Sequence, residues 1–545
     1  MFSSSRRSRS LSLGAALLLA ALSPAAELPV RTDRAAAPMV DQALEALTLA
    51  DLETGEAPGH WSSEQLTAHY LARIDALDRH GPQLRAVLEV QPNALREARQ
   101  LDRERRAGQV RGALHGAPIL LKDNIDTGDA LQLHTTAGSL ALLDSSPRQD
   151  AFIVRRLRAA GALILGKTNL SEWANYRSKQ ASSGWSARGG QTRNPFVLDR
   201  NPCGSSSGSG VAVAAELALA AIGTETDGSI VCPASVNGLV GIKPTLGLVS
   251  RSGIIPIAAS QDTAGPMARS VADAAALLNV LAGYDPDDPA TLPLKDHPPP
   301  DFRFALRRDA LKGVRVGVLR EYAGFQDDVD AHFERAIETL RSLGAIIVDP
   351  VSIPTKGKFD DDEHTVLQYE FKDGINRYLA TRNGAGPKDL AALIAFNETH
   401  HPQEMMWFGQ DIFVDAQRAG PLSDAAYIDA HERARRLAGP EGIDAALSAN
   451  QLDVLVAPTV GPAWLTDLID GDHTVGGDIT SPPAVAGYPH VTVPMEPVHG
   501  LPVGLSFVGT AWSDAALIGY AYAYEQATHF RRPPRFLPHL KETAP

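Results

Sequence analysis

Two serine-bearing segments lie close together in the sequence and could do nucleophilic chemistry. The first is a Ser/Gly run at residues 204–210, and the second spans residues 224–229. Serine is a weak nucleophile unless another group accepts its proton during the attack. A lysine can accept that proton only when it is neutral, because the charged ammonium has no free lone pair. The two segments therefore direct attention to any lysine that burial could neutralise.

Lys122 is the candidate for this base. It follows Ile119-Leu120-Leu121, a short apolar run that is typical of a buried strand. Most lysines in such a position extend to solvent. A lysine held inside the protein instead has its pKa lowered from about 10.4, which allows it to act as a base. Taken alone, Lys122 gives no reason to expect a buried base. The two serine segments are the reason to consider that it acts as one.

The Ser/Gly run also matches the letters of a nucleophile elbow, G-x-S-x-G, with Ser206 as the nucleophile. That motif requires a strand running directly into it and a helix leaving it. A helix is predicted from about residue 209 to 219. Residues 199–202, Asp-Arg-Asn-Pro, indicate a turn where the strand should be. We therefore do not expect an α/β-hydrolase.

Residues 161–168, Gly-Ala-Leu-Ile-Leu-Gly-Lys-Thr, match the letters of a phosphate-binding P-loop. A P-loop follows its strand and surrounds phosphates with exposed amides. Here the intervening Ala-Leu-Ile-Leu is itself predicted to be the strand. We therefore expect no nucleotide site at this position.

The elements that position these segments alternate between strands and helices. This alternation indicates an α/β layered fold with a largely parallel or mixed sheet. No linker is long enough to separate two domains. Helices are predicted at residues 62–80, 93–107, 151–160, 270–281, 330–343 and 515–528, and strands at residues 85–90, 119–121, 163–165, 314–319, 345–348, 454–457, 490–493 and 503–508.

Two regions outside this pattern are expected to shape a pocket. Residues 169–201 are polar and rich in turns, which is typical of a long ordered loop. Residues 356–438 are more helical and more polar. The acidic run at residues 360–364 and the pair His400-His401 have no metal-ligand spacing, so we interpret them as solvated loops and expect no metal.

Several separated motifs, in order along the chain, resemble the amidase signature family. The resemblance spans roughly Ser62 to the C-terminus. It implies a single catalytic domain, residues 27–545, with a large central mixed β-sheet covered by helices on both faces and core motifs in residues 117–270. The matching segments are Lys122, residues 191–195, 204–210, 223–229, 238–245, 265–271 and 500–505.

The resemblance implies a Ser–cis-Ser–Lys triad formed by Ser229, Ser205 and Lys122. Ser229 would attack the amide carbonyl and form an acyl-enzyme. Ser205, after a cis bond to Gly204, would carry the proton between Ser229 and a neutral Lys122. The same relay would then protonate the departing nitrogen. No metal or other cofactor is implied.

The resemblance also places an oxyanion or substrate-binding site at Thr226, Asp227 and Gly228, next to Ser229. Successive backbone N–H groups in a tight turn can face developing negative charge. Asp227 stands where the family commonly has glycine, and Cys203 and Ser207 also depart from its usual Ser/Gly run. A side chain at Asp227 leaves the identity of the amide donors open.

Residues 223–230, Gly-Thr-Glu-Thr-Asp-Gly-Ser-Ile, are similar to the peptide amidase branch of that family. The resemblance implies hydrolysis of the C-terminal amide of peptides with release of ammonia. Three alternatives stay open: an amidase of fatty, aryl or small aliphatic carboxamides, a glutamyl-tRNA amidotransferase-type subunit, and a binding protein without activity. Expected partners are the small-molecule or peptide amide and, at most, further copies of the chain in a simple homo-oligomer.

The charge and the N-terminal sequence indicate where the protein acts. A formal net charge of -13 argues against a nucleic-acid partner. Residues 1–26 resemble a bacterial signal peptide, with basic residues, an apolar stretch at residues 11–22 and small residues near Ala25. Arg6-Arg7 weakly indicates the twin-arginine route. We expect a periplasmic or secreted protein with no stable membrane association after cleavage.

The chain has two cysteines, Cys203 and Cys232, and each lies close in sequence to a candidate catalytic serine. Two cysteines do not make a disulfide scaffold, although export would permit their oxidation. We expect two buried free thiols, because free cysteine often serves as a small buried apolar residue.

Overall fold

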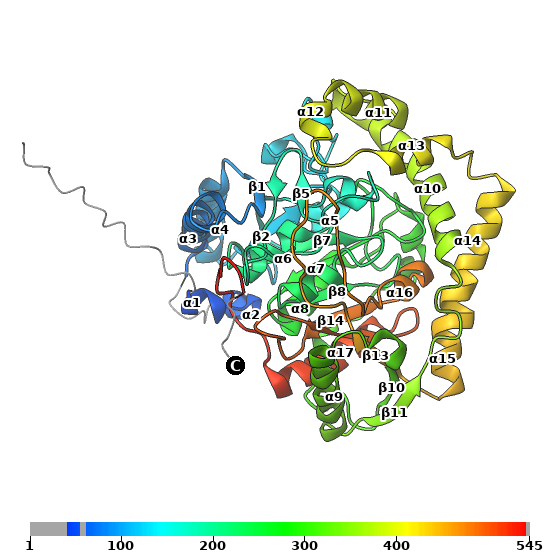
Figure 1. The fold of residues 1–545 in the computed structure, drawn as a ribbon. Coiled ribbons are helices and arrows are strands. Elements are labelled where there is room, and N and C mark those ends of the chain that lie inside the picture. Colours follow the sequence, from blue (N-terminus) through cyan, green and yellow to red (C-terminus); the bar gives the residue numbers. More distant parts are fainter. Residues whose placement is uncertain (1–40, 55–60, 541–545) are drawn as a thin grey trace, which may run out of the picture. The chain divides into compact units, whose positions relative to one another are not determined.

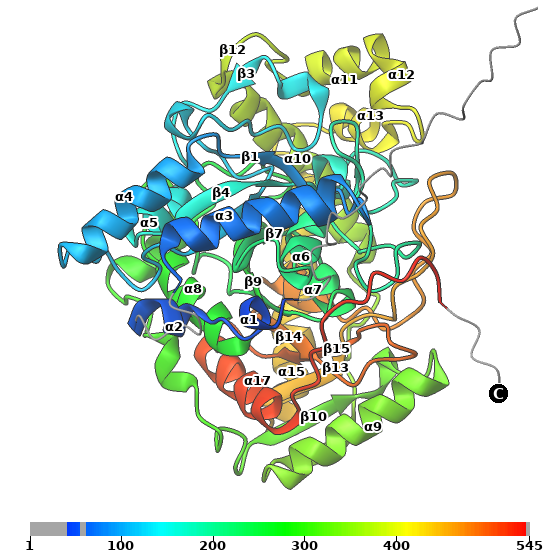
Figure 2. The ribbon, with the colours of Figure 1, turned by 90° about the vertical axis from the view of Figure 1, so that its left-hand side faces the viewer.

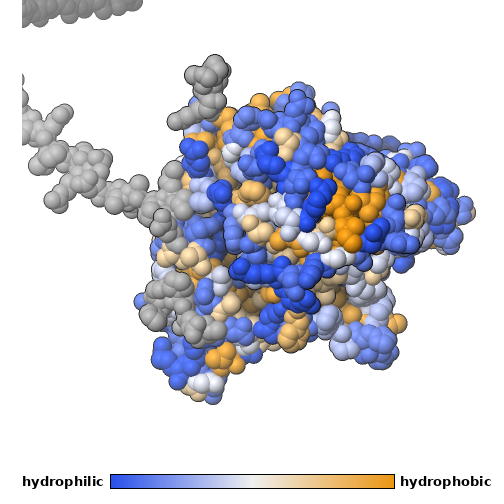
Figure 3. Space-filling model, turned by 90° about the horizontal axis from the view of Figure 1, so that it is seen from below, coloured by the Kyte–Doolittle hydropathy of each residue, from blue (hydrophilic) through white to orange (hydrophobic). Residues whose placement is uncertain are grey.

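The computed structural model describes residues 41–54 and 61–540. All of these described residues belong to one compact unit. The predicted signal segment, residues 1–26, lies outside the described residues. Among the described residues, no helix has both the length and the apolarity needed to cross a bilayer. The face drawn in Figure 3 is mostly hydrophilic, with separate hydrophobic areas between the polar ones.

In the described part of the chain, one mixed sheet of 11 strands forms the centre of the fold, which confirms the predicted fold class. β2 is parallel to both of its neighbours, β4 and β7, whereas β9 is antiparallel to both of its own. In spatial order the strands are β1 (Val87–Val90), β4 (Leu163–Thr168), β2 (Pro118–Lys122), β7 (Ala220–Glu225), β9 (Thr263–Ala268), β8 (Val240–Lys243), β14 (His490–Pro494), β15 (Gly504–Val508), β13 (Val454–Pro458), β10 (Arg315–Leu319) and β11 (Ile346–Val351).

Helices cover this sheet from two sides. In Figure 1, α3 (Ser63–Arg73) and α4 (Ala94–Arg106) lie to the left of the strands and α10 (Asp360–Thr381) and α14 (Ala425–Ala438) to the right. Figure 2 agrees, since α3 passes in front of the strands there. Further helices are α5 (Phe152–Ala159), α8 (Val271–Leu281), α9 (Asp327–Ser342) and α17 (Asp514–Thr528).

The strands β2, β4 and β7 are buried along their whole length. Parallel strands that are covered on both faces are expected to be almost continuously apolar. Residues 163–168 of the P-loop match form β4, so the intervening Leu-Ile-Leu is a strand, as predicted. Lys167 within them is fully buried, and its Nζ donates to the Ile125 carbonyl at 2.5 Å and to Thr135 Oγ1 at 2.8 Å. The sequence match therefore marks a strand and not a phosphate loop.

The segment after the Ser/Gly run differs from the prediction. The helix α6 (Ser207–Ala214) ends five residues before residue 219, the predicted end. Glu216 then takes a positive φ of 56°, which turns the chain into β7. The two serine segments are therefore joined by a helix, a turn and a central strand, and not by one helix. The strands β8 and β9 were also not predicted.

The prediction of a helical region at residues 356–438 is confirmed. The interpretation of residues 360–364 as a solvated loop is wrong, because these residues begin α10 and Asp362 and Glu363 are buried. Acidic side chains in a first turn are favourable beside the positive end of a helix dipole. The other helices here are α11 (Leu390–Thr399), α12 (His401–Glu404) and α13 (Asp411–Arg418).

Close packing in the middle of the sheet gives a stability prediction. A Cβ added at Gly265 in β9 would lie 2.0 Å from the Ile242 carbonyl oxygen, whereas one at Gly409 would meet nothing within 4 Å. We expect Gly265→Ala to destabilise the protein by about 1–3 kcal/mol and Gly409→Ala to leave stability nearly unchanged. Thermal unfolding of both variants measures the difference. Equal shifts in the two variants would contradict this description of the sheet.

Candidate active site

Lys122 is the last residue of β2 and is fully buried. Its Nζ donates to Ser205 Oγ at 2.7 Å, to Thr224 Oγ1 at 2.9 Å and to the Thr224 carbonyl oxygen at 3.1 Å. Loss of solvent lowers the pKa of Lys122 to about 7, although the nearby carboxyl groups of Glu225 and Asp262 act in the opposite direction. A large fraction of this lysine is therefore neutral near pH 7.

Ser205 lies in a loop that approaches the strands closely. The peptide bond from Gly204 to Ser205 is cis, and Ser205 is fully buried. The Ser205 carbonyl accepts a hydrogen bond from the Ser171 N–H at 3.1 Å. A Cβ at Gly204 would lie 2.1 Å from Ser171 Oγ, so a larger residue at this position would have to displace the Ser171 hydroxyl.

Ser206, which would be the nucleophile of a G-x-S-x-G elbow, has a structural role instead. Its hydroxyl donates to the Thr224 carbonyl at 3.1 Å and accepts from the Thr224 N–H at 3.2 Å, so it is bound to the backbone of β7. No strand immediately precedes residue 204 in the described chain. The structure thus lacks the strand–turn–helix arrangement of an elbow at Ser206.

Ser229 lies in the turn that follows β7 and is 8% exposed. Its carbonyl accepts a hydrogen bond from the Ser206 N–H at 3.1 Å, which joins the turn to the Ser205 loop. The sequence placed Lys122, Ser205 and Ser229 in one site. The structure connects Lys122 to Ser205 by a side-chain hydrogen bond and connects the backbones of the two serine segments.

The turn between β7 and α7 (Val231–Val236) is organised by the buried carboxylate of Glu225. This carboxylate accepts hydrogen bonds from the N–H groups of Ile230 at 2.7 Å and Val231 at 3.0 Å. The Gly228 N–H also faces it and, like those two, favours its charged form, whereas burial raises its pKa overall. Glu225 therefore fixes the backbone of the turn that carries Ser229.

Other amides of the same turn have no protein acceptor. The N–H groups of Thr226, Asp227 and Ser229 make no hydrogen bond within the described part of the chain. Gly228 has a φ of +72°, a conformation that glycine adopts readily. The free N–H groups are the kind of donors that an oxyanion requires. Oxyanion binding at Thr226, Asp227 and Gly228 remains a prediction.

The two carboxylate oxygens of Asp227 have different surroundings. Its Oδ2 accepts from the Ser481 hydroxyl at 2.6 Å, while its buried Oδ1 has no partner among the described residues. Burial, together with the nearby carboxyl of Asp478, raises the pKa of Asp227 to about 7. The carboxyl group that replaces the usual glycine is therefore protonated more readily than that of an exposed aspartate.

Two cavities border this turn. The Ser205 cavity has a volume of about 250 Å³, and its lining includes Asn124, Ser205, Thr224, Thr226, Ile254, Ile257 and Arg251. The Asp227 cavity has a volume of about 270 Å³, and its lining includes Gly204, Asp227, Gly228, Cys203, Cys232, Trp464 and Asp478. The hydroxyl bound to Lys122 thus opens on one cavity and the acidic side chain on the other.

The expectation of two free thiols is wrong, because Cys203 and Cys232 form a disulfide. Their Cα atoms are 6.0 Å apart, although 29 positions separate them in sequence. The fold brings them together because the loop before Ser205 packs against the start of α7. The disulfide connects the residue before Gly204 to the third residue after Ser229, so it ties the two serine segments together.

Sequence reasoning assigned no role to Thr224, Asn124 or Glu225. Thr224 Oγ1 accepts from both Lys122 Nζ and Asn124 Nδ2, each at 2.9 Å. Asn124 stands two residues after Lys122, and Thr224 and Glu225 begin the second serine segment. Their proximity in sequence to the triad was the available signal. Their roles depend on the pairing of β7 with β2, which the sequence did not predict.

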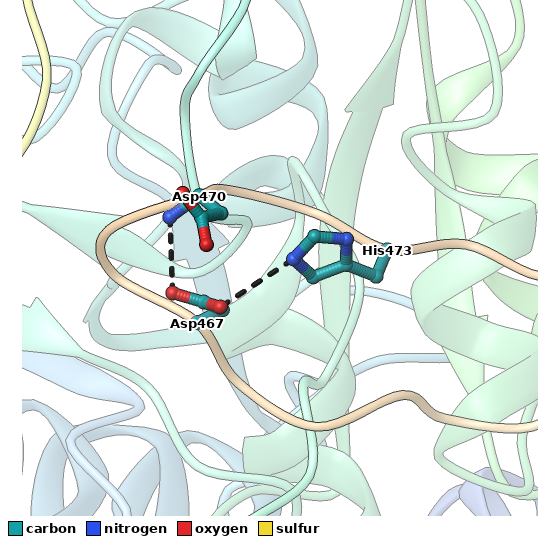
Figure 4. Close-up of side chains that lie close together, drawn as sticks. All are labelled: Asp467, Asp470 and His473. Carbon is teal, nitrogen blue, oxygen red and sulfur yellow. Dashed lines mark hydrogen bonds and ion pairs between the residues drawn. The ribbon is translucent and has the colours of Figure 1, made fainter.

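One group of side chains in the described residues has the composition of a metal site. Asp467, Asp470 and His473 lie close together in an exposed loop (Figure 4). Asp467 Oδ1 accepts N–H hydrogen bonds from Ile469 and Asp470, and its Oδ2 lies 3.4 Å from His473 Nε2. These contacts form a local turn. The arrangement needs no ion to explain it.

Comparison with known proteins identifies the family. The Amidase family profile matches residues 65–518. The chain belongs to the amidase family. It is therefore an amide hydrolase with the amidase signature fold. A "Probable amidase" of Arabidopsis thaliana is 41% identical over 500 residues, covering 90% of this chain and 91% of that one. A glutamyl-tRNA(Gln) amidotransferase subunit of Pseudomonas syringae is 34% identical, covering 90% and 99%.

The solved structures include close relatives of this amidase. The native peptide amidase of Stenotrophomonas maltophilia is 56% identical, with a TM-score of 0.84, and the match covers 90% of this chain and 98% of that one. The peptide amidase PAM in complex with the competitive inhibitor chymostatin is also 56% identical, with a TM-score of 0.85 and coverage of 90% and 99%. The fold is thus the same along nearly the whole described chain.

The disulfide can be tested without an activity assay. We expect the protein, unfolded without reductant, to show no thiol that reacts with Ellman's reagent, and two thiols after reduction. Replacing both Cys203 and Cys232 with serine should lower the free energy of unfolding by about 2–4 kcal/mol, because the crosslink restricts the unfolded chain. Two reactive thiols before reduction would contradict the structure.

Proposed function

We propose that this amidase removes the C-terminal amide of peptides and releases ammonia, through an acyl-enzyme on Ser229. The observation that carries the mechanism is the hydrogen bond from a fully buried Lys122, with a pKa near 7, to Ser205 Oγ. The 56% identity to a peptide amidase over 90% of the chain supports the substrate class.

In the proposed acylation, Ser229 Oγ attacks the amide carbon as its proton passes to Ser205 Oγ. Ser205 gives its own proton to neutral Lys122. The carbonyl oxygen becomes an oxyanion, and N–H groups of the 226–229 turn stabilise it, typically by about 3 kcal/mol for each donor. The C–N bond breaks while Ser205 protonates the nitrogen, Lys122 returns a proton to Ser205, and ammonia departs.

Water then hydrolyses the acyl-enzyme through the same proton relay. Its proton passes through Ser205 to Lys122 while its oxygen attacks the acyl carbon. Collapse of the second tetrahedral intermediate returns a proton to Ser229 Oγ and releases the carboxylic acid. A proton relay whose pKa lies near the working pH is suited to both half-reactions.

Two alternatives to peptide-amide hydrolysis are the hydrolysis of other carboxamides and a role in an amidotransferase. Other carboxamides fit the same chemistry, and a panel of fatty, aryl and small aliphatic amides distinguishes them. A role in an amidotransferase has support from the 34% identity to the glutamyl-tRNA(Gln) amidotransferase protein of Pseudomonas syringae. The net charge of -13 disfavours a tRNA-binding role. Copurification with further subunits would favour it.

We also propose that the protein is exported and acts in the periplasm or outside the cell, on peptide or small-molecule amides. The basic and apolar character of residues 1–26 supports export. The disulfide between Cys203 and Cys232 suits an oxidising compartment. A monomer or a simple homo-oligomer is sufficient for this activity, because the proposed triad comes from a single chain.

The triad assignment predicts the behaviour of four variants. We expect Ser229→Ala to form no acyl-enzyme, and Ser205→Ala and Lys122→Ala to lower kcat by about 10²–10⁴-fold through loss of the proton relay. Ser206→Ala should still be acylated at Ser229, because its hydroxyl binds the backbone of β7. Ammonia release from an N-blocked peptide amide gives the rates, and mass spectrometry of quenched enzyme locates the acyl group. An acyl-enzyme in Ser229→Ala would refute the assignment.

A further inference from the structure

Asn124 is a buried polar residue for which the triad gives no role. It lies two residues after Lys122, is 4% exposed and lines the Ser205 cavity together with Ser205 and Thr224. Its carbonyl accepts a hydrogen bond from the Ile255 N–H at 2.9 Å, which holds its backbone against the wall of that cavity. The side chain is therefore placed beside the proton relay.

The two ends of the Asn124 side chain have different partners. Its Nδ2 donates to Thr224 Oγ1 at 2.9 Å, the same oxygen that accepts from Lys122 Nζ. Its Oδ1 is buried and has no hydrogen-bond partner among the described residues. A buried carbonyl oxygen without a donor is unfavourable, and such a group in a cavity calls for a ligand that carries an N–H or O–H.

We propose that Asn124 Oδ1 accepts a hydrogen bond from the –NH2 of the substrate's scissile carboxamide, so that the Ser205 cavity holds the leaving group. This inference rests on the proposed function. In that function Ser205 protonates the departing nitrogen, so the nitrogen must lie within reach of Ser205 Oγ. Asn124 and Ser205 line the same cavity, and the amide nitrogen is the part of the substrate's carboxamide that has N–H to donate.

The proposal makes Asn124 a determinant of leaving-group specificity. A hydrogen bond from the –NH2 orients the nitrogen lone pair as the tetrahedral intermediate forms, and protonation by Ser205 and C–N cleavage then follow. An ester oxygen has no hydrogen to donate, so a methyl ester of the same peptide gains nothing from Asn124. The ratio of amide to ester hydrolysis therefore reports this contact, and a variant that keeps the acceptor oxygen but loses the donor to Thr224 separates the contact from an effect on the relay.

The test uses an N-blocked peptide as its C-terminal carboxamide and as its methyl ester, with kcat/KM measured for wild type and variants. We expect Asn124→Ala to lower kcat/KM for the amide by about tenfold more than for the ester, since one hydrogen bond is worth roughly this factor. Loss of support for Thr224 and Lys122 would also weaken protonation of the amide nitrogen, so Asn124→Asp, which loses the donor to Thr224 but keeps the acceptor, is needed to separate the two causes. A uniform loss, or no loss, would overturn the proposal.

Asn124→Asp provides the second variant, because it keeps an acceptor oxygen of the same shape. We expect it to retain the wild-type ratio of amide to ester hydrolysis at a pH where Lys122 is neutral. Its carboxylate should also move the acidic limb of the pH profile upward, because a nearby negative charge raises the pKa of a lysine. A ratio as low as that of Asn124→Ala would overturn the proposal, since the side-chain nitrogen would then be the group that matters.

Ile257→Val is the matched control on the wall of the same cavity, with no polar atom changed. We expect it to alter amide and ester hydrolysis by the same factor. Thermal unfolding establishes that each variant is folded before rates are compared. If wild type hydrolysed the ester but no peptide amide, the proposed function would fail as well, an outcome distinct from a changed ratio in the variants.

Discussion

The burial of the Lys122 ammonium is the constraint on which the rest of the site depends. A charged lysine without solvent is unfavourable, and three hydrogen bonds from Nζ do not fully replace water. The resulting pKa of about 7 is a balance, because Glu225 and Asp262 favour the charged form. A proton can therefore enter and leave the site at little cost near neutral pH.

The order of strands supplies the partners that this lysine requires. β2 lies between β4 and β7, so the end of β2 meets Thr224 near the end of β7. Thr224 Oγ1 then serves both Lys122 and Asn124, and the next residue, Glu225, holds the turn that carries Ser229. One strand thus positions the base, the amides near the nucleophile and the proposed contact to the leaving group.

The sequence predicts some of this arrangement and misses other parts for physical reasons. The apolar run before Lys122 forecast β2, and the motif resemblance placed Lys122, Ser205 and Ser229 in one site. β9 was missed because its sequence, Thr-Ala-Gly-Pro-Met-Ala, contains a proline and a glycine, which usually disfavour a central strand. β7 was missed because its Ala-rich start continues the composition of α6.

The disulfide could not be predicted from the sequence for a different reason. Cys203 and Cys232 each lie near a candidate catalytic serine, but sequence spacing alone does not determine whether two cysteines pair. Their approach depends on the turn at Glu216 and on the packing of α7 against the Ser205 loop. Likewise, the acidic residues 360–364 carry no periodic signal of their own, and only the long helix that follows shows that they are its first turn.

The most direct test of a neutral, buried Lys122 is the pH dependence of its effect on Ser229, measured without a substrate. A fluorophosphonate reacts with an activated serine, and its second-order rate constant reports the proton relay of the free enzyme. Because Lys122 accepts a proton only when neutral, we expect the rate constant to rise with pH through a single step near pH 7. A rate constant that is flat from pH 5 to 9, or equally steep in Lys122→Ala, would contradict this account.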